Sequence, residues 1–380
     1  MAISFFLQHA RRRRTCFFYY LQKSQCCSHQ KYRCTPNFPK CFSRTMGFLG
    51  LLPNEHYIRD IFILALFSAV VATLCSIRFY LRITAGRCFT ETIMEGKTVL
   101  ITGANSGIGK ETARDLAKRG ARIIMACRNL ETANIVKDEI VKETGNTKLV
   151  VKKLDLGSQK SVREFAADIV KTEQKIDVLI HNAGMALAFR GQTSEDGIEL
   201  TMATNHFGPF LLTHLLIDVL KKSTPARIVI VASELYRLAS VNVDKLNPIG
   251  TFPAAYLYYV SKYANIYFAR ELAKRLEGSG ITVNFLHPGM IDSGIWRNIP
   301  FPLNYPMMAI TKSFFKTTKA GAQTTIYLAT SDEVANVTGK YFMDCKETTL
   351  NAAALDEEKG KKIWEESVKM VKLTAQDPKI

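Results

Sequence analysis

Gly103-Ala104-Asn105-Ser106-Gly107-Ile108-Gly109 lies between an apolar run, Thr98-Val99-Leu100-Ile101, and a helical pattern that begins at Lys110. This order predicts a strand, a tight glycine turn and a helix N-terminus. Glycines let the backbone approach a phosphate closely, and the free N–H groups and dipole of the helix favour negative charge. A nucleotide is the expected ligand, although the turn alone is equally compatible with a structural role.

Apolar runs alternate with helical patterns throughout the region that follows Lys97. Continuous apolar strands separated by helices indicate a parallel sheet covered on both faces. The expected fold class is therefore α/β, a doubly wound parallel sheet (Rossmann fold), with a short strand near Lys340–Met343 closing one edge. The other expected strands are Thr98–Ile101, Arg122–Ala126, Leu149–Leu154, Asp177–Ile180, Arg227–Val231 and Ile281–Leu286.

The length of 380 residues fits one α/β domain with an N-terminal extension. We expect a basic leader over 1–46, a transmembrane anchor over 57–82, a catalytic domain over 95–350 and a C-terminal helical tail over 351–380. Much of the net charge of +17 lies in the leader, which has nine Lys/Arg and no Asp or Glu. Such a leader is typical of a mitochondrial presequence, but an unstructured extension or a translation start at Met46 remains open. Nucleic-acid binding is not expected, because the basic residues lie outside the folded region.

An uncharged apolar run extends from Ile61 to Ile77. As a helix it covers ~25 Å, close to the ~30 Å hydrocarbon core of a bilayer, and flanking aromatic residues extend it. We therefore expect a single membrane anchor, with a soluble packing helix as the alternative. If Met46 is the start, the basic residues after the run place the following domain in the cytosol. With the full leader, the positive charges on the two sides of the run nearly balance.

The nine cysteines do not indicate a disulfide framework, because five lie in the leader and Cys75 lies in the apolar run. Cys88, Cys127 and Cys345 remain for the domain. No Cys/His group has the spacing of a zinc site, so no metal is expected.

Four polar residues in the domain have the chemistry that hydride transfer to a carbonyl requires. Tyr258 and Lys262 lie at i and i+4, on one face of a helix, where a cation is expected to lower the pKa of the phenol. Ser233 ends the expected fifth strand, where it could bind a substrate oxygen or simply start a helix. Asn205 could hold a water that relays protons from Lys262, or be a satisfied core amide.

The end of the second expected strand bears on cofactor choice. A carboxylate there would bind the ribose 2′-hydroxyl of NAD and repel the 2′-phosphate of NADP. The chain instead has neutral Cys127 and the cation Arg128, a phosphate partner unless it is merely solvated. NADP(H) is therefore favoured over NAD(H).

With these motifs in order, the chain resembles the short-chain dehydrogenase/reductase family over about residues 95–350. The resemblance implies Tyr258 as acid/base, Lys262 as the pKa-lowering and ribose-binding residue, Ser233 as the substrate-orienting hydroxyl and Asn205 as the relay. Two departures stand out, His181 for a common Asn and Ala232 for a frequent Ser, and neither removes a catalytic group. The motifs are TGANSGIG from Thr102, LDL with Asp155, HNAG from His181, Asn205, Ser233, YYVSK from Tyr258 and HPG from His287.

The resemblance also implies a set of cofactor contacts. Asp155 would contact the adenine, and Asn182-Ala183-Gly184 would line the cofactor cleft. The full expected set is Gly103, Asn105, Ser106, Gly107, Ile108, Gly109, Arg128, Asp155, Leu156, Asn182, Ala183, Gly184, Tyr258, Lys262, Pro288 and Gly289.

Within that family the chain is most similar to the membrane-anchored retinol dehydrogenases, on the residues 126–129, 205–216, 261–265 and 339–346. This implies an enzyme that interconverts a lipophilic alcohol and its aldehyde or ketone, with retinol and retinal as the first candidates. The segment Ile299–Phe315, rich in Phe, Pro, Met and Tyr, suits a lipophilic substrate that enters from a bilayer, or ordinary lid packing. A steroid, prenol or xenobiotic carbonyl reductase and a non-catalytic nucleotide-binding scaffold are the alternatives.

The resemblance extends to location and assembly. We expect the endoplasmic reticulum membrane with a cytosolic catalytic domain, or the mitochondrion because of the basic leader. A homodimer through the long helices that begin near Glu195 and Pro253 is common in the family.

Overall fold

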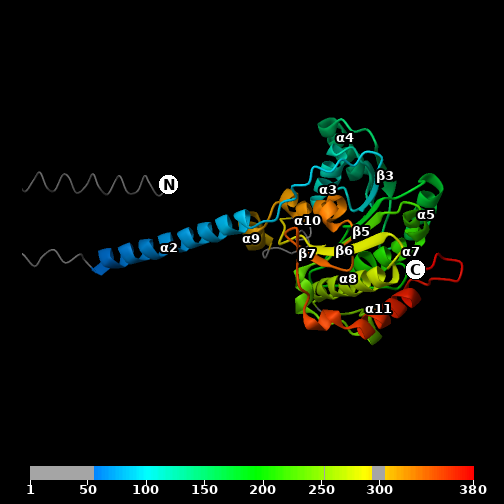
Figure 1. The fold of residues 1–380 in the computed structure, drawn as a ribbon. Helices are drawn as coiled ribbons and strands as arrows, with labels where there is room; N and C mark the ends of the chain where they lie inside the picture. Colours follow the sequence, from blue (N-terminus) through cyan, green and yellow to red (C-terminus); the bar gives the residue numbers. More distant parts are fainter. Residues whose placement is uncertain (1–54, 252, 293–303) are drawn as a thin grey trace, which may run out of the picture. The chain divides into compact units, whose positions relative to one another are not determined.

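The computed structural model describes residues 55–251, 253–292 and 304–380 (Figure 1). The predicted leader and the first part of Ile299–Phe315 lie outside the described residues. By its contacts the chain divides into two units, Met1–Val70 and Val71–Ile380.

The second unit is built on one eight-stranded sheet with the order β3-β2-β1-β4-β5-β6-β7-β8. All neighbouring strands are parallel except β7 and β8, which are antiparallel. The predicted edge strand is therefore wrong in one respect: β8 forms the edge, because Asp344 and Cys345, with φ of 53° and 60°, turn the chain back. The strands are β1 Thr98–Thr102, β2 Arg122–Cys127, β3 Leu149–Lys153, β4 Val178–His181, β5 Ala226–Val231, β6 Ile281–His287, β7 Tyr341–Met343 and β8 Lys346–Glu347.

Helices cover both faces of this sheet (Figure 1). The helices α3, α4 and α10 pack on one face, and α5, α7 and α8 pack on the other with α11 against α8. Separate apolar cores fill the two sides. The α-helices of the unit are α3 Gly107–Lys118, α4 Leu130–Thr144, α5 Gln159–Thr172, α6 Leu200–Met202, α7 Gly208–Lys221, α8 Ala255–Arg275, α9 Asn304–Phe314, α10 Thr318–Thr330 and α11 Glu357–Met370.

The central strands are apolar along their whole length because both of their faces are covered. Every residue of β1 and of β4 is buried. This is the pattern of a parallel doubly wound sheet, as the continuous apolar runs predicted.

The apolar run forms helix α2, Glu55–Ile83, which extends beyond Ile61–Ile77 at both ends. Its part Ile58–Ile83 is long and apolar enough to cross a membrane, and none of its most apolar window is buried against the protein. This composition is compatible with the predicted anchor.

Candidate active site

The predicted site residues lie just beyond the carboxyl ends of the parallel strands. The sheet changes winding direction between β1 and β4, which are neighbours although β2 and β3 separate them in sequence. In open α/β sheets ligands bind at such a switch point. The glycine turn follows β1 and Asn182 follows β4, so these two segments meet there.

The glycine turn has the geometry of a phosphate cradle. Gly103 and Gly107 have φ of 67° and 57°, values that favour glycine. A Cβ at Gly109 would lie 2.4 Å from the oxygen of Gly103, so the start of α3 packs directly on the turn. Ser106 does not cap α3 with its side chain, and the first turn of the helix has no acidic residue. These features fit a bound pyrophosphate.

The segment Asn182–Gly184 is fixed to the end of β1 by hydrogen bonds. The amide nitrogens of Asn182 and Ala183 each donate to Thr102 Oγ1 at 3.0 Å, and Asn182 Nδ2 donates to Thr102 O at 2.9 Å. A Cβ at Gly184 would lie 3.4 Å from Lys262 Nζ and 3.6 Å from Asn205 Oδ1. The structure thus brings the NAG segment, Lys262 and Asn205 together.

The end of β2 presents one buried thiol and one exposed cation. The thiol of Cys127 is buried, which raises its pKa to about 11, although backbone hydrogen bonds from Ala104 and Asn105 act the other way. Within the described residues the exposed Arg128 guanidinium has no hydrogen bond or ion pair. Asn105 Nδ2 donates to Thr132 Oγ1 at 2.9 Å, which ties the glycine turn to α4. Arg128 is therefore available to an anionic ligand.

Asp155 and Leu156 form the turn after β3. Asp155 Oδ1 accepts a hydrogen bond from the amide of Gly157 at 2.9 Å. Leu156 is buried, and a Cβ at Gly208 would lie 2.3 Å from its oxygen, so this turn packs against the start of α7. The contact with adenine that the family resemblance implies stays a prediction.

Tyr258 and Lys262 lie together on α8, and burial shifts the pKa of each. Lys262 Nζ lies 5.6 Å from the centroid of the Tyr258 ring and donates to Val231 O at 2.8 Å. Burial raises the pKa of Tyr258 to about 12, while a hydrogen bond with Ser233 acts in the opposite direction. Burial also lowers the pKa of Lys262 to about 8. Burial is therefore the main influence on the pKa of Tyr258 in the protein alone. The lowering of that pKa by Lys262 stays a prediction.

Ser233 joins the end of β5 to a short 3₁₀ helix, Glu234–Leu238. Its hydroxyl accepts a hydrogen bond from the amide of Leu235 at 3.3 Å and also bonds with Tyr258. The serine therefore both starts a helix and faces the phenol. The helix start is confirmed, and the contact with a substrate oxygen stays a prediction.

Asn205 lies in a five-residue π-helix, η2, Ala203–Phe207, between α6 and α7. Its side chain is fully engaged. Oδ1 accepts from the amide of Met185 at 2.8 Å, and Nδ2 donates to Met185 O at 2.9 Å and to Ser261 Oγ at 3.0 Å. Asn205 therefore holds the segment after Gly184 against α8 as a satisfied amide, and its role as a proton relay stays a prediction.

Lys316, which no sequence motif indicated, supports the loop containing Pro288 and Gly289. The amide of Lys316 donates to Met290 O at 2.8 Å, and a Cβ at Gly289 would lie 2.9 Å from Lys316 Cδ. Lys316 Nζ pairs with Asp344 Oδ1 at 2.5 Å, and the same oxygen accepts from the amide of Gly86 at 2.9 Å. The only sequence signal was the family-like segment around Asp344, to which the sequence assigned no role.

His181, one of the departures from the family pattern, is buried. Thr213 Oγ1 donates to Pro209 O, so His181 Nε2 donates to Thr213 Oγ1, 2.8 Å away. Burial lowers the pKa of His181 to about 3 and keeps the ring neutral. These contacts give the ring a structural role.

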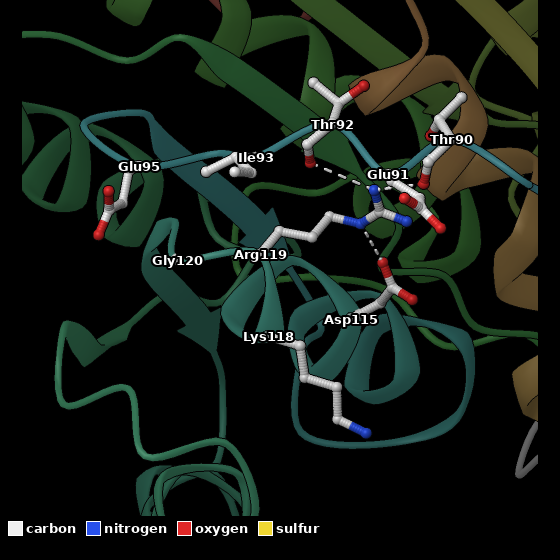
Figure 2. A pocket seen from close by; sticks show the side chains of 9 residues that line it. All are labelled: Thr90, Glu91, Thr92, Ile93, Glu95, Asp115, Lys118, Arg119 and Gly120. Carbon is white, nitrogen blue, oxygen red and sulfur yellow. Dashed lines mark hydrogen bonds and ion pairs between the residues drawn. The ribbon is translucent and has the colours of Figure 1, made fainter.

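A pocket of about 550 Å³ lies at the opposite, amino edge of the sheet (Figure 2). Arg119 crosses it and donates to Thr90 O at 2.7 Å and to Asp115 Oδ1 at 2.6 Å. No predicted site residue is among those that line this pocket. Arg119 holds the segment before β1 against α3, so we assign the pocket no part in the chemistry.

Comparison with known proteins gives the same picture. A model of the short chain dehydrogenase family matches residues 97–301. The chain is 45% identical over 296 residues to retinol dehydrogenase 14 of Homo sapiens, covering 74% of this chain and 88% of that protein. An uncharacterized protein from Mycobacterium paratuberculosis has a solved structure with a TM-score of 0.60 and 30% identity, covering 76% of this chain and 98% of that one. The Pseudomonas aeruginosa RhlG/NADP active-site complex has a TM-score of 0.54 and 25% identity, covering 66% and 95%.

Proposed function

The chain belongs to the short-chain dehydrogenase family, and from this premise we propose that it is a membrane-associated, NADP(H)-dependent oxidoreductase that interconverts a lipophilic alcohol and its aldehyde or ketone. Retinol and retinal are the proposed substrate pair. The observation that carries the proposal is the meeting of Ser233, Tyr258 and Lys262 at the carboxyl edge of the sheet, beside the glycine turn.

In the proposed reaction Tyr258 transfers the proton and Ser233 orients the substrate oxygen. A bound nicotinamide nucleotide supplies the hydride chemistry. With a pKa of about 12 the phenol holds its proton at neutral pH, which suits donation to a carbonyl oxygen during reduction. Its hydrogen bond with Ser233 places the two hydroxyls where one substrate oxygen can contact both. Lys262, held at Val231 O, has a pKa of about 8 and supplies a mostly protonated ammonium beside the phenol at neutral pH.

The proposed preference for NADP(H) rests on Arg128. Its guanidinium is exposed at the end of β2, and no carboxylate pairs with it within the described residues. A guanidinium binds a 2′-phosphate through two parallel hydrogen bonds, whereas NAD(H) offers no such group. Several of the remaining cofactor contacts would come from the glycine turn, from Asn182–Gly184 and from the loop at Gly289.

The proposed lipophilic substrate is supported by α2 and by the similarity to retinol dehydrogenase 14. An anchor helix concentrates the enzyme at a bilayer, where retinoids dissolve. We propose the endoplasmic reticulum as its location, with the catalytic unit in the cytosol, where NADPH is the reducing nucleotide.

The test is a panel of retinoid, steroid and prenol carbonyls, assayed on membranes containing the full chain with NADPH and with NADH. The proposal expects retinal to be reduced fastest and NADPH to be preferred. Faster turnover of a steroid or prenol carbonyl would overturn the substrate assignment, and a preference for NADH would overturn the cofactor assignment. No turnover with either nucleotide would overturn the proposal as a whole.

A further inference from the structure

A buried chain of hydrogen bonds connects the C-terminal helix α11 with the active site. We propose that Ser367 on α11 positions the segment around Asn205 through His206 and Asn265, so that the C-terminal helix is part of the active-site scaffold. The inference rests on the proposed function, because the position of the Asn205 segment affects catalysis only if the protein is the proposed oxidoreductase. Ser367, His206 and Asn265 are positioning residues and do not touch the reacting atoms.

The series of hydrogen bonds begins at the main-chain oxygen of Asn205, which lacks its α-helical donor. In an α-helix the oxygen of Asn205 would accept from the amide of residue 209, but that residue is Pro209 and has no N–H. The π-helix η2 lies at this point. Asn265 Nδ2 donates to this oxygen at 2.8 Å, which gives it a side-chain donor where the α-helical one is missing.

His206 connects Asn265 with α11. Its Nδ1 lies 3.1 Å from Asn265 Oδ1, and its Nε2 lies 2.9 Å from Ser367 Oγ. Because Asn265 uses Nδ2 for Asn205, it presents an acceptor to His206, so the proton is on Nδ1. Nε2 then has no proton and can only accept, so the single proton of the Ser367 hydroxyl is shared between Nε2 and Ile363 O, 2.7 Å away, and serves one of them at a time. Burial lowers the pKa of His206 to about 4, so the ring stays neutral with this single tautomer.

The helix that carries Ser367 is firmly placed. Trp364 packs edge-on against Phe210 of α7, with ring centroids 4.9 Å apart, and also contacts His214 at 5.1 Å. The guanidinium of Arg275 lies 4.4 Å from the centroid of Trp364. Ser367 itself is fully buried. Its hydroxyl therefore has a fixed position from which to hold His206.

A displacement of η2 would change the positions of both the NAG segment, which is expected to line the cofactor cleft, and the catalytic helix α8. The side chain of Asn205 holds both Met185, which follows the NAG segment, and Ser261, which precedes Lys262. Asn265 lies one helical turn after Lys262 on α8. Loss of the Asn265 hydrogen bond therefore loosens Asn205 at the point where Gly184 and Lys262 approach each other.

The experiment compares retinal reduction and NADPH binding across variants of the full chain. Asn265→Leu and His206→Gln break the contact at Asn265, and each should lower kcat about tenfold, the effect of about one buried hydrogen bond. Ser367→Ala should lower kcat about threefold. His206→Asn keeps a donor at the Nδ1 position but no longer reaches Ser367, so it should resemble Ser367→Ala. The matched control is Glu357→Gln, which removes the exposed ion pair between Lys274 of α8 and α11 and should leave kcat unchanged.

A double variant separates positioning from general destabilisation. In the His206→Asn background residue 206 no longer reaches Ser367, so the series of hydrogen bonds is already interrupted. Adding Ser367→Ala should therefore have no further effect on kcat. An equal loss in both backgrounds, or an unchanged kcat in Asn265→Leu, would overturn the inference.

Hydrogen exchange provides a readout that does not depend on activity. Amides of residues 203–208 should exchange faster in Asn265→Leu than in the wild type, and Glu357→Gln should leave them unchanged. If the wild type reduces no carbonyl, the proposed function fails while this measurement still decides the inference. Unchanged exchange in Asn265→Leu would contradict it.

Discussion

Lys262 Nζ lies 2.8 Å from the main-chain oxygen of Val231, the last residue of β5. The carboxyl end of that strand thus fixes the position of the ammonium, two residues before Ser233. Only 3% of Lys262 is exposed, and this burial lowers its pKa to about 8. The ammonium beside Tyr258 is thus maintained at a cost in stability, as is common for functional charges.

The first prediction concerns the stability of Lys262→Met. The unfolded chain takes up the Lys262 proton below a pKa of 10.5 and the folded chain only below about 8. Between these values the unfolded state binds more protons, so this residue makes the fold more stable as pH rises. Between pH 7.5 and pH 10.5 the free energy of unfolding of the wild type, measured relative to that of the variant, should rise by up to about 3 kcal/mol. Chemical denaturation in detergent measures both, and parallel pH curves would be inconsistent with a buried, destabilised ammonium.

The second prediction concerns acid stability and His181. Its pKa is lowered from 6.5 to about 3, so the stabilising contribution of the neutral ring is complete above pH 6.5 and is lost as pH falls toward 3. His181→Asn, which restores the common family residue, should unfold less readily than the wild type at pH 4, with a difference of up to about 3 kcal/mol. Retinal reduction at pH 7 should be unaffected. An identical acid dependence in both proteins would show that His181 does not resist protonation.

The third prediction tests Arg128 as the phosphate partner. Arg128→Ala should raise the KM for NADPH at least tenfold, because a charge-assisted pair with phosphate is lost, and should change the KM for NADH little. Lys222→Ala, which removes an exposed cation at the C-terminal end of α7, is the matched control and should change neither value. Equal loss with both nucleotides would assign Arg128 a structural role.

The fourth prediction is that the catalytic unit does not dimerise through α7 and α8. The helix α11 packs on α8, and Trp364 packs against α7, whose exposed residues are Asp218 and Lys221. This coverage argues against the homodimer expected from the long helices, because the apolar surface is already buried within one chain. Light scattering of the detergent-solubilised chain should give a monomer. A stable dimer that is broken by substitutions at Asp218 and Lys221 would contradict this view.

Most of the fold was predictable because it depends on local patterns. The strands β1, β2 and β6 begin where the apolar runs predicted them and extend one residue further, and the glycine turn joins β1 to α3. The helix begins at Gly107 rather than Lys110, because glycine gives no apolar signal at a helix start.

The rest of the site depends on contacts between distant residues, which periodicity does not encode. Asn205 and His206 bond with Asn265 and Ser367, which lie far along the sequence. The pKa of Tyr258 could not be predicted either, because it depends on how much protein encloses the phenol. Spacing predicted a cation near the ring, but not that burial would raise the pKa of the phenol.

The central claim is that Tyr258 transfers the proton to a carbonyl oxygen, and the direct measurement is retinal reduction by Tyr258→Phe with NADPH. The substitution removes only the hydroxyl, so nucleotide binding, followed by fluorescence of NADPH, should remain within about twofold of the wild type. Turnover should fall by about 10²–10⁴-fold, which is the usual contribution of general acid catalysis. Turnover within a factor of a few of the wild type, with binding intact, would contradict the assignment of Tyr258.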